Sequence, residues 1–105
     1  MVKVCHVNDL PEKSAKVVMV HDTPIAVFNV EGKIFAWDNR CPHRGASLGD
    51  GYITATTVQC KFHLWEFDIK KECAVANKTI KLKSFPIAIK GQDIFLDISR
   101  AEKEP

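Results

Sequence analysis

The sequence predicts an all-β fold, a small antiparallel β-sandwich or barrel with two ligand-bearing loops. Short runs rich in β-branched residues recur along the 105 residues, and turn-forming residues separate them. No stretch of the sequence shows helical periodicity over three turns. The length suits one core, and we expect a single domain over residues 1–105.

The first third of the chain alternates predicted strands and tight turns. Residues 2–7 alternate apolar and polar side chains, which indicates a half-buried strand. β-Branched runs at 15–20 and 24–30 predict two more strands. Glu31 and Gly32 then predict a two-residue hairpin connection into a strand at 33–37, which leads directly toward Cys41.

The rest of the chain continues this pattern after an irregular, glycine-containing segment at 42–52. The strands expected there cover residues 53–59, 65–69, 78–83, 85–90 and 94–98. Lysines alternate with apolar residues at 78–83, so we expect one face of that strand to be solvated.

Charge and hydropathy exclude several classes of function. The net charge is +2, from 15 basic and 13 acidic residues that are interspersed, so no basic tract indicates nucleic-acid binding. The start of the sequence lacks the pattern of a secretory signal, and the apolar runs are too short to span a bilayer. We therefore expect a cytoplasmic protein with no nucleic-acid or membrane partner.

Two short motifs carry the candidate metal ligands. Cys41-x-His43 and Cys60-x-x-His63 each pair one thiolate with one imidazole, and 16 residues separate His43 from Cys60. That spacing suits two loops at the ends of a connecting strand, which close on a single site. The other two cysteines, Cys5 and Cys73, lie in apolar runs and are expected to be small buried residues.

Two thiolates and two neutral imidazoles suit either one zinc ion or a binuclear iron–sulfur cluster. Structural zinc sites usually keep two cysteines on one knuckle and two histidines on a helix. Here each segment carries one cysteine and one histidine, which suits a [2Fe-2S] cluster with two unlike irons. A zinc-stabilised binding module is the alternative from a different class of function.

The motif pair, with Gly45 after the first histidine, resembles the signature of Rieske iron–sulfur domains. The likeness extends to the Leu-Gly-Asp-Gly segment at 48–51, the strand that contains Trp65 and Phe67, and the closing hairpin. The resemblance implies the Rieske fold and one [2Fe-2S] cluster. By the same resemblance its ligands are Cys41, His43, Cys60 and His63.

Four positions favour the soluble Rieske-type ferredoxins over the respiratory members of the family. The respiratory members carry two extra cysteines that form a disulfide, where this chain has Ala46 and Phe62. They also place a serine and a tyrosine, which donate to the cluster sulfurs, where this chain has Trp65 and Phe67. Loss of these donors makes the reduced cluster harder to form, so we expect a potential toward the low end of the Rieske range.

The chain also departs from the ferredoxin pattern at three places. Leu64 and Glu72 stand where the family usually has glycine, and residues 76–78 lack a proline that is common in the loop covering the cluster. These departures leave all four expected ligands in place.

The function implied by the resemblance is that of a one-electron carrier, passing electrons from a flavin-dependent reductase to a terminal oxygenase. The chain has no Gly-x-Gly-x-x-Gly dinucleotide fingerprint and no second set of metal ligands, so we do not expect it to be an enzyme by itself. The small subunit of an assimilatory nitrite reductase is the alternative within the redox class. We expect a monomer.

The sign of the docking surface is left open by the sequence. Basic residues flank the ligands at Arg40, Arg44 and Lys61, and acidic residues lie close to them in sequence at Asp38, Asp50 and Glu66.

Overall fold

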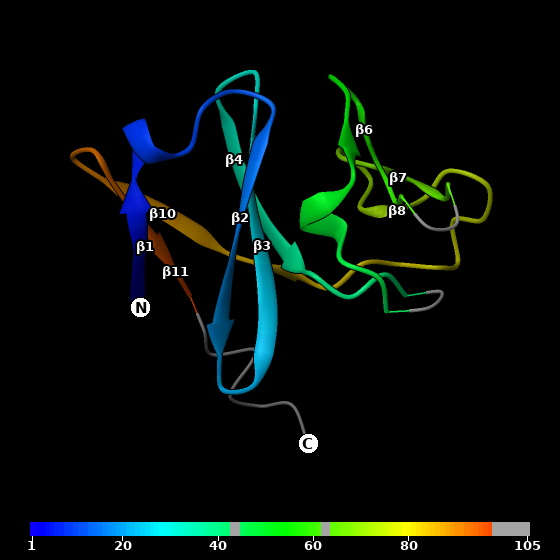
Figure 1. The fold of residues 1–105 in the computed structure, drawn as a ribbon, viewed down its shortest axis with the longest axis horizontal. Coiled ribbons are helices and arrows are strands. Elements are labelled where there is room, and N and C mark those ends of the chain that lie inside the picture. The colour runs from blue at the N-terminus through cyan, green and yellow to red at the C-terminus, as the bar shows by residue number, and fades with distance from the viewer. Residues whose placement is uncertain (43–44, 62–63, 98–105) are drawn as a thin grey trace.

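The computed structural model describes residues 1–42, 45–61 and 64–97 (Figure 1). These residues form three antiparallel sheets and two 3-10 helices of three residues each. The prediction of an all-β fold is confirmed. Within the described part of the chain, no helix is long and apolar enough to cross a membrane.

The first sheet joins the two ends of the described chain. Its strands, in spatial order, are β1 (Val2–His6), β11 (Asp93–Leu96) and β10 (Ile87–Lys90). β1 pairs with β11 from Val2 opposite Leu96 to His6 opposite Asp93, with one irregularity between Lys3 and Cys5. The predicted first strand and the closing hairpin are therefore confirmed, apart from residue 98, which lies outside the described residues. The predicted strand at 85–90 is divided at Pro86, because Phe85 pairs with Ala36 and only residues 87–90 join the hairpin.

The second sheet is the central layer of the molecule, between the other two sheets in Figure 1. Its strands, in spatial order, are β2 (Ser14–Val20), β3 (Thr23–Val30), β4 (Lys33–Asp38) and β9 (Ser84–Phe85). Glu31 and Gly32 connect β3 to β4 with φ of 52° and 84°, as a type I′ turn requires. The predicted hairpin is therefore confirmed.

The third sheet lies beside the second, on the side away from the first sheet (Figure 1). Its strands, in spatial order, are β5 (Tyr52–Ile53), β6 (Thr57–Gln59), β7 (Glu66–Asp68) and β8 (Cys73–Ala74). The chain passes from β4 to β5 through the 3-10 helix η2 (Leu48–Asp50), and the other 3-10 helix, η1 (Val7–Asp9), follows β1. β8 was not predicted from the sequence.

The predicted continuous strand at 53–59 is wrong, because a turn divides it into β5 and β6. The Thr54 hydroxyl oxygen accepts hydrogen bonds from the backbone N–H groups of Thr56 and Thr57. The Thr54 N–H donates in turn to the carbonyl oxygen of Thr57. Threonine side chains thus satisfy the backbone locally and replace the ladder that their β-propensity indicated.

The predicted strand at 78–83 is also wrong. The Asn77 side-chain oxygen accepts from both the N–H and the hydroxyl of Thr79, which makes a turn where a strand was expected. The only strand-like pairing described for this segment is a single bridge between Lys81 and Cys73. The segment is therefore a loop, in which Lys78 and Lys81 are exposed and Leu82 is buried in the core.

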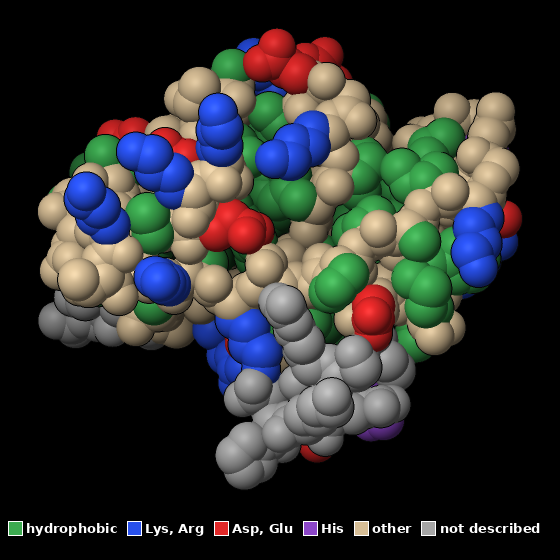
Figure 2. Space-filling view, turned by 180° about the vertical axis from the view of Figure 1, so that it is seen from behind, with side chains coloured by type: hydrophobic (Ala, Val, Ile, Leu, Met, Phe, Trp, Pro, Cys, Tyr) green, Lys and Arg blue, Asp and Glu red, His purple; other side chains and the backbone are tan. Residues whose placement is uncertain are grey.

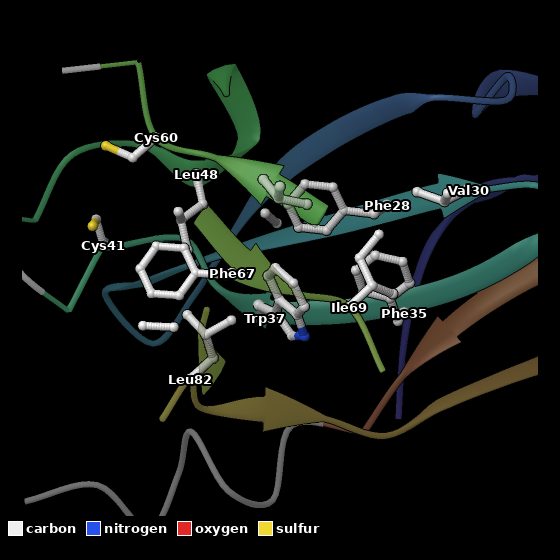
Figure 3. Close-up of a cluster of buried hydrophobic side chains, with 13 residues drawn as sticks. Phe28, Val30, Phe35, Trp37, Cys41, Leu48, Cys60, Phe67, Ile69 and Leu82 are labelled. Atoms are coloured by element: carbon white, nitrogen blue, oxygen red, sulfur yellow. The ribbon is translucent and has the colours of Figure 1, made fainter. Parts of the chain in front are cut away.

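A buried cluster fills the space between the second and third sheets (Figure 3). The Phe28 ring lies 5.1 Å from Phe35 and 5.3 Å from Trp37, between ring centroids, and Phe67 is buried in the same cluster. Phe35 and Trp37, from the predicted strand at 33–37, both belong to this core. Cys5 and Cys73 are buried free cysteines, as expected.

One hydrogen bond joins these two sheets through the cluster. The indole N–H of the fully buried Trp37 on β4 donates to a carboxylate oxygen of Glu72 at 2.9 Å. Glu72 lies in the turn between β7 and β8 with φ of 56°, a conformation that favours glycine. The bond to Trp37 gives this departure from glycine a structural role.

Replacement of Trp37 by phenylalanine is expected to lower the free energy of unfolding by about 2 kcal/mol, because the N–H donor and part of a packed side chain are lost. Urea denaturation at pH 7 measures this. Glu72→Gln keeps an amide oxygen that can accept the same bond, and is expected to cost about half as much or less. Equal losses in both variants would contradict the assigned role of the bond.

Candidate metal centre

The first ligand loop begins three residues after β4. Cys41 is 2% exposed, and its N–H donates to the carbonyl oxygen of Ala46 at 2.8 Å. The N–H of Gly45 returns a bond to the Cys41 carbonyl oxygen at 2.7 Å. Gly45 has φ of 75° and no atom within 4 Å of where a Cβ would lie, so this backbone angle alone favours glycine.

The second ligand loop repeats this hydrogen-bond pattern around Cys60. The Cys60 N–H donates to the carbonyl oxygen of Trp65 at 2.8 Å, and the Leu64 N–H donates to the Cys60 carbonyl oxygen at 2.9 Å. In each loop the cysteine bonds to the fifth residue after it, and the fourth residue bonds back to the cysteine. Leu64, at the position equivalent to Gly45, has φ of 57°.

The two loops bring the two predicted thiolate ligands to one end of the core. Cys41 and Cys60 belong to the same buried cluster as Leu48 and Phe67. Figure 3 shows both sulfurs at the same end of that cluster, beyond Leu48 and Phe67. The other two predicted ligands, His43 and His63, lie outside the described residues, as do Arg44 and Phe62. Two buried thiols on matched loops fit the donor set that an iron–sulfur cluster needs.

The sequence of the chain matches one known protein family. Residues 1–86 match the family described as the Rieske [2Fe-2S] domain. The chain belongs to that family.

Relatives of known name share nearly the full length of this Rieske domain. The chain is 37% identical over 101 residues to the 3-phenylpropionate/cinnamic acid dioxygenase ferredoxin subunit of Shigella boydii, covering 93% of each protein. It is 34% identical over 92 residues to the ferredoxin component of the naphthalene 1,2-dioxygenase system of Pseudomonas aeruginosa, covering 87% of this chain and 88% of the relative.

Solved structures give the same assignment. A chain from a complex of reduced oxygenase and oxidized ferredoxin in carbazole 1,9a-dioxygenase aligns with a TM-score of 0.84 and 26% identity, over 91% of this chain and 100% of that one. The protein is therefore a Rieske-type ferredoxin, an electron carrier with one [2Fe-2S] cluster, and is not a catalyst by itself. This assignment displaces the zinc-stabilised binding module.

The nitrite reductase alternative has weaker support. The structure described as a putative NADH-dependent nitrite reductase small subunit from Mycobacterium tuberculosis aligns with a TM-score of 0.82 over 90% of this chain and 91% of that one, but at 17% identity. That likeness shows the Rieske fold alone.

Asn39 fixes the first loop of this Rieske domain, and the sequence interpretation did not single it out. Its side-chain N–H donates to the Ser47 hydroxyl at 2.8 Å, and its side-chain oxygen accepts from the Gly49 N–H at 2.6 Å. Its backbone N–H donates to the carbonyl oxygen of Pro24. Asn39 is buried, so these bonds join the ligand loop, η2 and β3 at one residue.

Gln59 has a similar role at the second loop and was also missed. Its side-chain N–H donates to the carbonyl oxygen of Leu64 at 3.0 Å. Gly51 packs so closely against the backbone of Gln59 that a Cβ there would clash with the Gln59 carbonyl oxygen. The available sequence signal was a carboxamide side chain within two residues before each cysteine.

An ion pair next to the first loop neutralises one of the charges that flank the ligands. The Arg40 guanidinium donates to Asp38 with Nε–Oδ1 and Nη2–Oδ2 distances of 2.9 and 2.6 Å. Burial alone would raise the pKa of Asp38, but the hydrogen bonds and charge of Arg40 outweigh it and lower that pKa below its usual value. Asp38 is therefore ionised at neutral pH, and the charge of Arg40 is compensated locally.

Leu64 occupies a left-handed backbone conformation where the family usually has glycine. An L-residue with a side chain pays about 1–2 kcal/mol in the left-handed region. The Leu64 side chain is 61% exposed, so burial returns little of that cost. The loop therefore contains local strain that the hydrogen bonds to Cys60 and Gln59 hold in place.

Leu64→Gly is expected to raise the free energy of unfolding by about 0.5–1 kcal/mol, because relief of the strained angle exceeds the entropic cost of glycine. Leu64→Ala removes the same exposed side chain but keeps a Cβ, and is the matched control; no gain is expected from it. Thermal unfolding of the two variants measures the difference. A glycine variant less stable than the alanine variant would contradict the strain.

Proposed function

We propose that this Rieske domain carries single electrons from a flavin-dependent reductase to a terminal oxygenase. The observation that carries the proposal is the likeness to ferredoxin components of dioxygenase systems over nearly the whole chain. The structurally similar chain from the complex of oxygenase and ferredoxin in carbazole 1,9a-dioxygenase supports an oxygenase as the electron acceptor. The reductase, a monomeric state and a cytoplasmic location remain predictions from the sequence.

We also propose that Cys41, His43, Cys60 and His63 hold the cluster, within one domain that spans residues 1–105. The two buried thiols on matched loops support the cysteine assignments. The bound cluster accepts and releases one electron. The chain supplies the thiolates and fixes their loops through Asn39 and Gln59. It also packs the buried side chains of Phe67 and Leu48 behind the thiolates, which excludes water from the core side of the site.

The function is tested by reconstitution. Purified protein with iron and labile sulfide is combined with NADH, a flavin-dependent reductase and a terminal oxygenase of a dioxygenase system. Oxygenated product is expected only when all components are present. Product formation at an unchanged rate without this chain would reject the carrier role.

The ligand assignment is tested with two buried cysteines that differ in their proposed role. Cys60→Ala is expected to abolish the visible absorption and the rhombic, low-average-g EPR signal of the reduced cluster. Cys73→Ala is the matched control, because Cys73 is equally a buried free cysteine of the third sheet. It is expected to retain iron and sulfide. Cluster loss in the Cys73 variant with retention in the Cys60 variant would refute the assignment.

The reduction potential is expected near the low end of the Rieske range, about −150 mV. Neither Trp65 nor Phe67 has a hydroxyl to donate to a cluster sulfur, and Phe67 is fully buried in the core behind the two cysteines. Trp65→Ser supplies a hydroxyl and is expected to raise the potential by about 40 mV, the equivalent of a hydrogen bond of about 1 kcal/mol.

Trp65→Ala is the control for this potential shift, since it removes the same ring without adding a donor. A redox titration of the three proteins separates the effects. A wild-type potential among the respiratory members, or equal shifts in the serine and alanine variants, would contradict the role of the missing donors.

A further inference from the structure

Positive charge is concentrated in one segment of this nearly neutral chain. Residues 70–83 contain five lysines and one glutamate, a net charge of +4, whereas the whole chain carries +2. The rest of the chain is therefore slightly acidic. The average charge hides an asymmetry that is large enough to shape the field on one face.

Four of these lysines are exposed on the turns of the third sheet and the segment after it, and Lys33, at the start of β4 in the second sheet, lies beside two of them. The lysine strip consists of five exposed residues, which are Lys33, Lys70, Lys71, Lys78 and Lys81. Lys33, Lys70 and Lys71 line one hollow of about 440 Å³, and Lys71 and Lys78 line a second of about 130 Å³. In Figure 2, basic side chains gather over the left half of the molecule, which is the half that contains the third sheet.

Two carboxylates among these lysines are bonded inward. Asp68 lines both hollows, and its side-chain oxygen accepts from the backbone N–H of Lys71 at 2.8 Å. The Glu72 carboxylate accepts from the Trp37 indole. Both acidic residues are partly buried, whereas the five lysines are exposed. An approaching molecule therefore meets the ammonium groups first.

The lysine strip adjoins the metal centre. The second hollow shares Ala74 and Val75 with a third, mostly apolar hollow of about 230 Å³, which Leu64, Trp65 and the exposed Glu66 line. The Val75 N–H donates to the carbonyl oxygen of Glu66 at 2.9 Å, which fastens this segment beside the Cys60 loop. Leu64 and Val75 are 61% and 58% exposed. A basic surface thus continues into an apolar edge next to the second ligand loop.

We propose that the lysine strip docks an acidic face of the redox partner protein, with Leu64 and Val75 as the apolar contact beside the cluster. This inference rests on the proposed electron-carrier function and adds the chemistry of the partner surface. An acidic protein fits better than a nucleic acid, because residues 70–83 contain neither arginine nor the aromatic side chains on which bases stack. Steering by such a strip accelerates association and weakens with salt.

The test uses holoprotein and two anionic probes. Ferricyanide oxidises the dithionite-reduced protein in a stopped-flow experiment, and a labelled decapeptide of glutamate reports binding by fluorescence anisotropy. The strip variant is Lys70→Glu/Lys71→Glu/Lys78→Glu. The control is Lys13→Glu/Lys16→Glu/Lys90→Glu, which changes the net charge equally through exposed lysines outside the third sheet.

At low salt the strip variant is expected to slow ferricyanide oxidation and to weaken peptide binding, each about fivefold or more. The control is expected to change each by less than about twofold. Equal effects in both variants would overturn the proposal, because only net charge would then matter. If the charge-reversed protein does not fold, Lys70→Gln/Lys71→Gln/Lys78→Gln is compared with Lys13→Gln/Lys16→Gln/Lys90→Gln. The strip variant is then expected to lose about twofold, and the control is expected to show no loss.

A labelled ten-nucleotide DNA strand distinguishes the other class of partner. Tighter binding of DNA than of peptide at about 150 mM salt, lost in the strip variant, would overturn the proposal in favour of a nucleic acid. Absence of the cluster spectrum from the wild-type protein would instead reject the proposed function. An intact cluster with no effect of the strip variant would reject the lysine strip alone.

Discussion

Each ligand loop depends on one backbone hydrogen bond, from the N–H of the fourth residue after the cysteine to the cysteine carbonyl oxygen. That bond closes only if the donor residue enters the left-handed region, where Gly45 and Leu64 lie. Because the carbonyl is satisfied within the loop, the cysteine side chain can be buried without leaving its own backbone unpaired. The position of each thiol therefore follows from a local turn.

The relative position of the two thiols is a separate requirement, and it depends on contacts between elements. The first loop leaves the second sheet, whereas the second loop lies between β6 and β7 of the third. Asn39 ties the first loop to β3 and η2, and Gln59 ties the second loop to the end of β6. The bond between Trp37 and Glu72 and the buried cluster then hold the two sheets together. A change at this junction alters the distance between the thiols without touching either loop.

The extent to which the sequence predicted this structure follows from how local each signal is. The hairpin at Glu31 and Gly32 was predictable, because two adjacent residues contain the whole turn signal. The strand at 53–59 was not, since the Thr54 side chain satisfies backbone N–H groups that β-propensity assigns to a ladder. The same competition at Asn77 converts the lysine alternation into a loop.

The candidate site divides in the same way. Spacing singled out the two cysteines as candidate ligands, and the structure brings them to one end of the core because the loops that carry them are short local units. It did not identify Asn39 or Gln59, whose partners lie 5 to 10 residues away and become neighbours only when the loops fold back. Leu64 was visible as a departure from the family pattern, but only the backbone shows that it keeps the angle of the glycine it replaces.

The sign of the docking surface shows why charge must be assessed in space. Arg40 flanks the first ligand loop, but the carboxylate of Asp38 lies within hydrogen-bonding distance and neutralises the charge of the Arg40 guanidinium locally. Opposite charges separated by less than a Debye length, about 8–10 Å in physiological salt, act on a partner as a dipole. Four lysines of the strip line two hollows that share Lys71, and Asp68 and Glu72 bond inward, so the lysine charges add at the surface. A chain with a net charge of +2 can therefore present a strongly basic face, and that face adjoins the loop that carries Cys60.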